Sequence, residues 1–230
     1  MSDYILWENL GNNTKLVMNQ LHYLGLAFMI LAYTLKVYQF LQKPAAAEGT
    51  PARGDHGKAI RYAYLTLAMP WELESQKRHW VRYGEFVLFH LAMVVGIGFA
   101  FVVPIVPELM KTPVIGGIAK LFFIFGFVIG ISRMGRRIFK PEMRKITSPD
   151  DFFCLILLTL WMFTGIFAAP LRSETWLFWY YCMATFFLFY VPFSKISHYV
   201  YYPFIRFYVG KHFGHRGTFP KKRVEGQQLY

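Results

Sequence analysis

The chain has 230 residues, of which 55% are hydrophobic, 20% aromatic and only 17% charged. Soluble domains carry about 25% charged residues, so the composition predicts a membrane protein. The net charge of +12 would suit a nucleic-acid partner, but Lys and Arg gather in alternate connections between apolar runs, which is the positive-inside pattern. Cys154 and Cys182 are too few for a zinc or iron–sulfur site, which needs about four ligands.

Five apolar runs are each close to the ~20 residues that cross a membrane. The first is preceded by a short N-terminal segment and followed by a long polar connection, and a basic tail ends the chain. The helices are predicted at 19–41, 84–103, 114–133, 151–169 and 175–198. They form a five-helix domain at 19–208, which includes the polar connection at 42–83. The N-terminal segment covers 1–18 and the basic tail 209–230.

Local signals set the ends of two of these helices. Pro104 and Pro107 are predicted to end the second, because proline cannot continue a helix. The segment Thr147–Ser148–Pro149–Asp150 predicts the start of the fourth, with a hydroxyl cap, a proline in the first turn and acids near the positive end of the helix dipole.

The distribution of basic residues predicts the orientation. Residues 42–84, 133–150 and the tail from 204 hold most of the Lys and Arg, whereas residues 104–113 hold only Lys111 and residues 170–175 only Arg172. By the positive-inside rule the N-terminus lies outside and the C-terminus is cytoplasmic. The predicted fold class is an all-α membrane bundle of five transmembrane helices.

The seven histidines differ in predicted depth. His22 lies near the outer end of the first helix. His90 lies about two turns from the inner end of the second helix, and His198 lies at the inner end of the fifth. The other four are expected in solvated segments: His56, His79, His212 and His215.

His90 and His198 therefore share a depth in the inner leaflet on two helices. A bis-imidazole haem needs two facing helices that each supply one neutral imidazole. The alternative is that each histidine only forms a hydrogen bond to a neighbouring helix, because polar groups in lipid are costly without a partner. Three small residues of the second helix leave room either for a macrocycle or for close helix contact: Ala92, Gly96 and Gly98.

Haem propionates would face the inner water, where basic residues are plentiful. Arg pairs with carboxylates in a bidentate geometry, which favours Arg136 and Arg137 after the third helix over Arg133. Lys195 and Arg206 flank His198. The alternative is that these residues only follow the positive-inside rule.

Three segments carry a resemblance to a known family: EFVLFH (85–90), RRIFKPEMRKITSPDD (136–151) and VPFSKISHYVYYPFIRF (191–207). The chain resembles the gamma (cytochrome b) subunit of respiratory nitrate reductase. The resemblance implies a five-helix subunit of a prokaryotic cytoplasmic membrane that passes electrons from quinol to an iron–sulfur subunit on the cytoplasmic side. It matches His90 and His198 to the family's inner haem ligands.

The chain departs from the family at the second haem. The family's other two ligands would fall at positions 100 and 180, where Ala100 and Tyr180 stand. A single haem b is therefore predicted. One inner haem cannot bridge a core of about 30 Å, so either quinone binds in the inner half or a partner subunit supplies an outer carrier.

Three residues are candidates for a quinone site. Lys111 and Lys120 lie around the outer start of the third helix, and the resemblance implies that a lysine there bonds a quinone carbonyl. Snorkelling to the membrane surface explains them equally well. His22 is a candidate for quinone or an altered haem site, with an interfacial histidine as the alternative.

The predicted function is a membrane-anchoring cytochrome b subunit that passes electrons between the quinone pool and a cytoplasmic iron–sulfur or flavin partner. The chain has no molybdenum, flavin or iron–sulfur motif, so terminal catalysis would lie in other subunits, and nitrate as the substrate does not follow. The alternative is a structural anchor without a cofactor. A small transporter is disfavoured because the sequence shows no inverted repeat.

Overall fold

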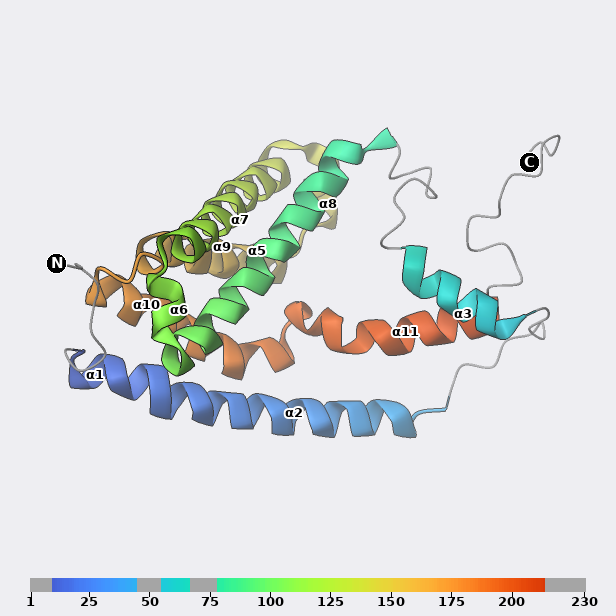
Figure 1. The fold of residues 1–230 in the computed structure, drawn as a ribbon. Coiled ribbons are helices and arrows are strands. Elements are labelled where there is room, and N and C mark those ends of the chain that lie inside the picture. The colour runs from blue at the N-terminus through green and yellow to red at the C-terminus, as the bar shows by residue number, and fades with distance from the viewer. Residues whose placement is uncertain (1–9, 45–54, 67–77, 214–230) are drawn as a thin grey trace. The chain divides into compact units, whose positions relative to one another are not determined.

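The computed structural model describes residues 10–44, 55–66 and 78–213. Within these ranges the regular elements are all helices (Figure 1). Five described helices are long and apolar enough to cross a membrane, which confirms the predicted all-α class, while the orientation of the termini stays a prediction. These spans are Asn12–Gln42, Trp80–Ile105, Pro113–Phe139, Pro149–Ala168 and Glu174–Phe193.

The first span begins earlier than predicted. It consists of α1 (Asn12–Lys15), a π-helical segment (Leu16–Leu21) and α2 (His22–Gln42). Residues 12–18, predicted as part of a short N-terminal segment, are therefore helical, while residues 1–9 lie outside the described ranges. Single-turn π segments are rare and often occur at functional sites; this one lies directly before His22.

The second span is α5 (Trp80–Ile105), and a short helix, α6 (Pro107–Lys111), follows it. Pro104 lies inside the last turn of α5 instead of ending the helix. A proline there removes the N–H that would bond to the carbonyl of Ala100, four residues earlier. That carbonyl accepts a hydrogen bond of 3.0 Å from the hydroxyl of Tyr181, which compensates for the missing donor.

The third and fourth spans are α7 (Pro113–Phe139) and α9 (Pro149–Ala168), joined through α8 (Pro141–Ile146). Part of the basic stretch predicted as a turn therefore extends α7. The predicted start of α9 is confirmed by a capping box. The backbone N–H of Asp151 donates to Ser148 Oγ at 3.3 Å, and the N–H of Ser148 donates to Asp151 Oδ2 at 2.8 Å.

The fifth predicted helix, 175–198, is interrupted. α10 (Glu174–Tyr190) gives way to a 3₁₀ turn at Val191–Phe193, a second at Lys195–Ser197, and then α11 (His198–Phe213). Pro192 lacks the N–H that a continuing helix needs, and Ser194 has extended backbone angles (φ −103°, ψ 170°). His198 therefore begins a helix rather than ending one. Residues 209–213 of the predicted tail belong to α11, and residues 214–230 lie outside the described ranges.

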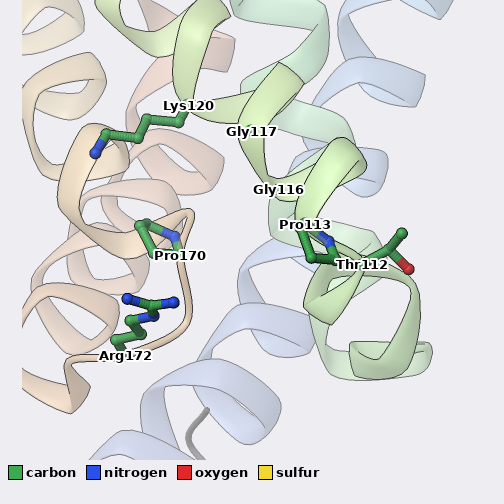
Figure 2. Close-up of a pocket in the computed structure, with 7 residues that line it drawn as sticks. All are labelled: Thr112, Pro113, Gly116, Gly117, Lys120, Pro170 and Arg172. Atoms are coloured by element: carbon green, nitrogen blue, oxygen red, sulfur yellow. The ribbon is translucent and has the colours of Figure 1, made fainter. Parts of the chain in front are cut away.

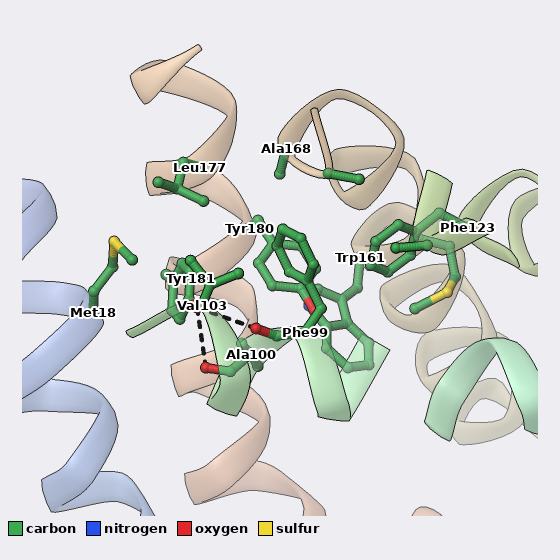
Figure 3. Packing of buried hydrophobic residues seen from close by; sticks show 14 of the residues in the cluster. Met18, Phe99, Ala100, Val103, Phe123, Trp161, Ala168, Leu177, Tyr180 and Tyr181 are labelled. Carbon is green, nitrogen blue, oxygen red and sulfur yellow. Dashed lines mark hydrogen bonds between the residues drawn. The ribbon is translucent and has the colours of Figure 1, made fainter. Parts of the chain in front are cut away.

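The chain forms two compact units. Unit 1 comprises Met1–Lys36 and Glu85–Ser197, and unit 2 comprises Val37–Gly84 and His198–Tyr230. In unit 1, α7 packs against α9, and α9 against α10. The core of unit 1 combines aliphatic residues with a group of aromatic side chains (Figure 3), and its largest buried side chains include Phe99, Phe123, Trp161, Tyr180 and Tyr181.

In unit 2, α3 (His56–Leu65) packs against α11. Gly210 allows the contact, because a Cβ at this position would lie 2.6 Å from the Cα of Ile60. The hydroxyl of Tyr64 donates a hydrogen bond to the carbonyl oxygen of Pro203. Asp55 caps the start of α3 by accepting a hydrogen bond of 3.0 Å from the N–H of Lys58.

Candidate functional site

His90 is half-buried on α5, and its ring nitrogen Nδ1 lies 2.7 Å from the carbonyl oxygen of Phe86, one turn earlier. Because a carbonyl oxygen can only accept a hydrogen bond, the proton of this contact lies on Nδ1. A neutral His90 therefore carries its lone pair on Nε2. Histidines that bind metals commonly donate the other ring N–H to a carbonyl or carboxylate, so His90 has the tautomer that a metal ligand needs.

His198 is exposed and is the first residue of α11. It belongs to unit 2, whereas His90 belongs to unit 1, so the pairing of the two residues stays a prediction. Within the described residues, no three His, Cys, Asp or Glu side chains are grouped to hold a metal ion. A bis-histidine haem requires only two axial ligands.

Positions 100 and 180 both lie in the core of unit 1. Tyr180 is fully buried, and its hydroxyl donates a hydrogen bond of 2.6 Å to the carbonyl oxygen of Gly96. Its ring stacks on Trp161, with ring centroids 5.5 Å apart and planes inclined by 24° (Figure 3). Buried side chains thus occupy the region in which the family's second pair of ligands would lie.

The glycines of α5 have different surroundings. A Cβ at Gly96 would lie 3.1 Å from the side chains of both Met162 and Trp161, whereas a Cβ at Gly98 would meet nothing within 4 Å. Gly96 therefore supports close helix packing, one of the two roles predicted for the small residues of this helix.

The two arginines predicted to hold propionates already contact protein groups. Arg136 forms an ion pair with Glu85, and Arg137 Nη1 donates to Thr147 Oγ1 at 3.0 Å. Arg133, which the sequence ranked below them, lies with its guanidinium 4.4 Å from the ring centroid of Phe89, the residue before His90. Glu85 stands in the same EFVLFH segment as His90 and was not identified as a partner from sequence.

Lys195 is also engaged. Its amino group lies 3.5 Å from Asp150 Oδ2 and 3.1 Å from Asp151 Oδ1, and it donates to Ser148 Oγ at 2.8 Å. The hydrogen bond to Asp151 raises the pKa of Lys195 above its ordinary value. This cluster joins the segment after α10 to the start of α9.

His22 is buried in the core of unit 1, with 1% of its surface exposed. Its Nδ1 lies 3.3 Å from Thr185 Oγ1, and its Nε2 has no hydrogen-bond partner among the described residues. The rings of Phe101 and Tyr181 lie 5.1 and 5.6 Å from its own. Its environment within unit 1 is therefore aromatic and closed.

Lys120 lines a cavity of about 190 Å³ in unit 1 (Figure 2). Arg172, which served in the sequence only as an indicator of orientation, lines the same cavity. The sequence did contain one signal that Arg172 lies close to the ends of two spans. Pro170, two residues before it, marks a tight turn between those spans. The other lining residues are Thr112, Pro113, Gly116 and Gly117. Lys111, the other predicted quinone residue, is the last residue of α6.

Comparison with known proteins found no matching family model, no similar curated protein and no similar solved structure. What the chain does must therefore be inferred from its own residues.

Proposed function

We propose that this chain is a membrane-embedded electron carrier that holds one haem b between His90 and His198. The observation that carries the proposal is the hydrogen bond of 2.7 Å between His90 Nδ1 and the Phe86 carbonyl. It leaves an unprotonated Nε2 on a half-buried imidazole within a transmembrane span, and ionisable residues in such spans are generally functional. The haem would supply one-electron chemistry, while the chain supplies its ligands and an apolar surrounding.

One haem is favoured over two by the packing at positions 100 and 180. Tyr180 is fully buried and bonded to Gly96, so a macrocycle there would require the aromatic core to separate. Close-packed cores resist such changes. A single haem also agrees with the resemblance to the nitrate reductase gamma subunit, in which this chain matches the inner pair of histidine ligands and lacks the other pair.

The partners follow from the charge distribution. The cytoplasmic face would carry the basic connections, with the N-terminus outside, in a prokaryotic cytoplasmic membrane. An iron–sulfur or flavin subunit docked on that face would exchange electrons with the haem, and quinone would be the second reactant. Electrostatic complementarity between a basic face and an acidic partner speeds such encounters.

A structural anchor without a cofactor is the second candidate. It is favoured by the bonds that Arg136, Arg137 and Lys195 already make to Glu85, Thr147 and Asp151. Basic residues satisfied within the protein do not need propionates as partners.

A reduced-minus-oxidised difference spectrum of the purified full chain, with haem counted per chain, tests the proposal. We expect a b-type band and one haem per chain. His90→Ala and His198→Ala should each abolish the band, while the matched control His79→Ala should keep it. A chain without haem would favour the anchor, and two haems would overturn the single-haem assignment. A band that survives either alanine substitution would overturn the assignment of that histidine as a ligand.

A further inference from the structure

Arg133 is a half-buried cation near the end of α7, within a membrane span. Its guanidinium carbon lies 4.4 Å from the ring centroid of Phe89 on α5. Phe89 is buried and directly precedes His90, the proposed haem ligand. Because arginine stays protonated in proteins, α7 holds a permanent positive charge against the residue next to that ligand.

The charge of Arg133 has no counter-ion of its own among the described residues. The charged groups that act on it are Arg136 and Arg137, which repel it, and Glu85, which attracts it. Glu85, however, forms an ion pair with Arg136. Within the part of the chain that the structure describes, the contacts of the Arg133 guanidinium include no hydrogen bond and no ion pair. A ring face attracts the cation but cannot accept the bidentate pair of hydrogen bonds that a guanidinium donates. The position is therefore suited to an anionic ligand.

The two arginines first predicted to hold propionates are already engaged. Arg136 pairs with Glu85, and Arg137 donates to Thr147 Oγ1 at 3.0 Å. Arg133 also lies outside the three segments that carry the family resemblance, of which the second begins at Arg136. Its availability for a ligand is therefore a property of the fold and does not follow from the resemblance.

Snorkelling to the membrane surface does not account for the position of Arg133. A snorkelling cation extends its charged group into water, as the exposed side chain of Lys140 at the end of α7 can. The guanidinium of Arg133 instead covers Phe89, which belongs to a buried apolar cluster with Ile129 and Leu155. The cation therefore lies against the packed helices rather than extending away from them.

We propose that Arg133 binds a propionate carboxylate of the haem b proposed at His90. The inference rests on the proposed function and adds a residue to its haem site. A carboxylate matches the planar fork of a guanidinium with two parallel N–H···O bonds, and an unpaired charge within a membrane span is costly. The competing anion near the end of a span is a lipid phosphate, and the experiment separates the two.

The test compares haem with haem dimethyl ester, in which both propionates are neutral esters. The purified full chain, produced without haem, is titrated with each compound in a neutral detergent, and binding is followed by the b-type absorption. We expect wild type to bind haem about tenfold or more tightly than the ester, because a charge-assisted hydrogen bond is lost. Arg133→Met should weaken haem binding by a similar factor and leave ester binding unchanged, so that the two losses do not add.

Two further variants serve as controls. Lys140→Met removes an exposed cation from the same end of α7 and should keep the full preference for haem. Arg133→Lys keeps the charge but loses the bidentate fork, so it should keep only part of the preference. A loss of preference in Arg137→Met instead of in Arg133→Met would overturn the assignment.

A second measurement covers a variant that does not fold without haem. The chain is then purified with haem, and the midpoint potential is measured by potentiometric titration. A neighbouring cation favours the added electron, since charge near the haem sets its potential. Arg133→Met should therefore have a lower midpoint potential than both wild type and Lys140→Met. An unchanged potential would overturn the role of Arg133.

The remaining outcomes distinguish this inference from the proposal on which it rests. A wild-type chain that binds neither compound would overturn the haem proposal and this inference with it. Equal affinity for haem and its ester, or a preference that survives Arg133→Met, would overturn the Arg133 assignment alone. So would native mass spectra in which Arg133→Met loses a retained anionic lipid while its preference for haem persists, because the site would then bind a lipid phosphate.

Discussion

The hydroxyl of Tyr181 donates a hydrogen bond of 3.0 Å to the carbonyl oxygen of Ala100, the carbonyl that Pro104 leaves without a helical donor. The neighbouring Tyr180 hydroxyl bonds to Gly96, whose carbonyl can still accept from the N–H of Ala100 in α5. Two adjacent tyrosines of α10 thus secure α5 at successive turns, but only Tyr181 satisfies a carbonyl that the helix itself cannot.

Tyr181→Phe should therefore destabilise the chain more than Tyr180→Phe. Leaving a buried carbonyl unsatisfied costs about 1–3 kcal/mol, whereas losing one interhelical hydrogen bond in a membrane protein costs about 0.6 kcal/mol on average. The free energy of unfolding in mixed micelles, measured by titration with a denaturing detergent, gives both values. Equal losses for the two variants would contradict the role assigned to Pro104.

Gly165→Ala should destabilise unit 1. A Cβ at Gly165 would lie 2.6 Å from the ring of Phe123, which is fully buried and cannot move aside. Overpacking of this kind costs about 1–3 kcal/mol. Gly98→Ala is the matched control, because its Cβ would meet nothing within 4 Å. The same denaturant titration checks both. Because alanine has a higher helix propensity than glycine, a loss in Gly98→Ala comparable to the loss in Gly165→Ala would contradict the assigned clash with Phe123.

His22→Phe should leave the free energy of unfolding unchanged or increase it. The substitution removes the buried Nε2 that lacks a partner among the described residues, and it keeps an aromatic ring against Phe101 and Tyr181. Only the contact of 3.3 Å with Thr185 is lost. A fall greater than about 1 kcal/mol, or loss of quinone-dependent electron transfer in a folded variant, would assign His22 a binding role.

The cap of α3 should depend on pH. The hydrogen bond from the Lys58 N–H lowers the pKa of Asp55 below its ordinary value of 3.8. The stabilisation is therefore fully present above the unfolded pKa and is lost as the pH falls through the lower folded pKa. The amide chemical shift of Lys58, followed by NMR, should titrate with a midpoint below 3.8. Asp55→Asn keeps an acceptor but should remove the titration, and an unchanged titration in this variant would refute the assignment.

Local sequence signals predicted the helical spans and the start of α9 well. Hydropathy over about 20 residues is a local property, and the capping box at Ser148 and Asp151 involves residues three apart. Predictions failed where a distant residue compensates for a local signal. Pro104 was expected to end α5, but Tyr181 supplies the missing donor from α10. The break after Tyr190 was not predicted either, because the apolar run continues through Pro192.

The amino-acid sequence by itself therefore determined the five apolar spans, the charged connections and the histidines that are candidates for haem. Only the tertiary structure decided which side chains contact one another. It buries Tyr180 against Trp161, pairs Arg136 with Glu85, closes His22 in an aromatic core and brings Lys120 and Arg172 to one cavity. Span length and capping depend on neighbours within a few residues, whereas each of these contacts depends on the packing of helices far apart in the chain.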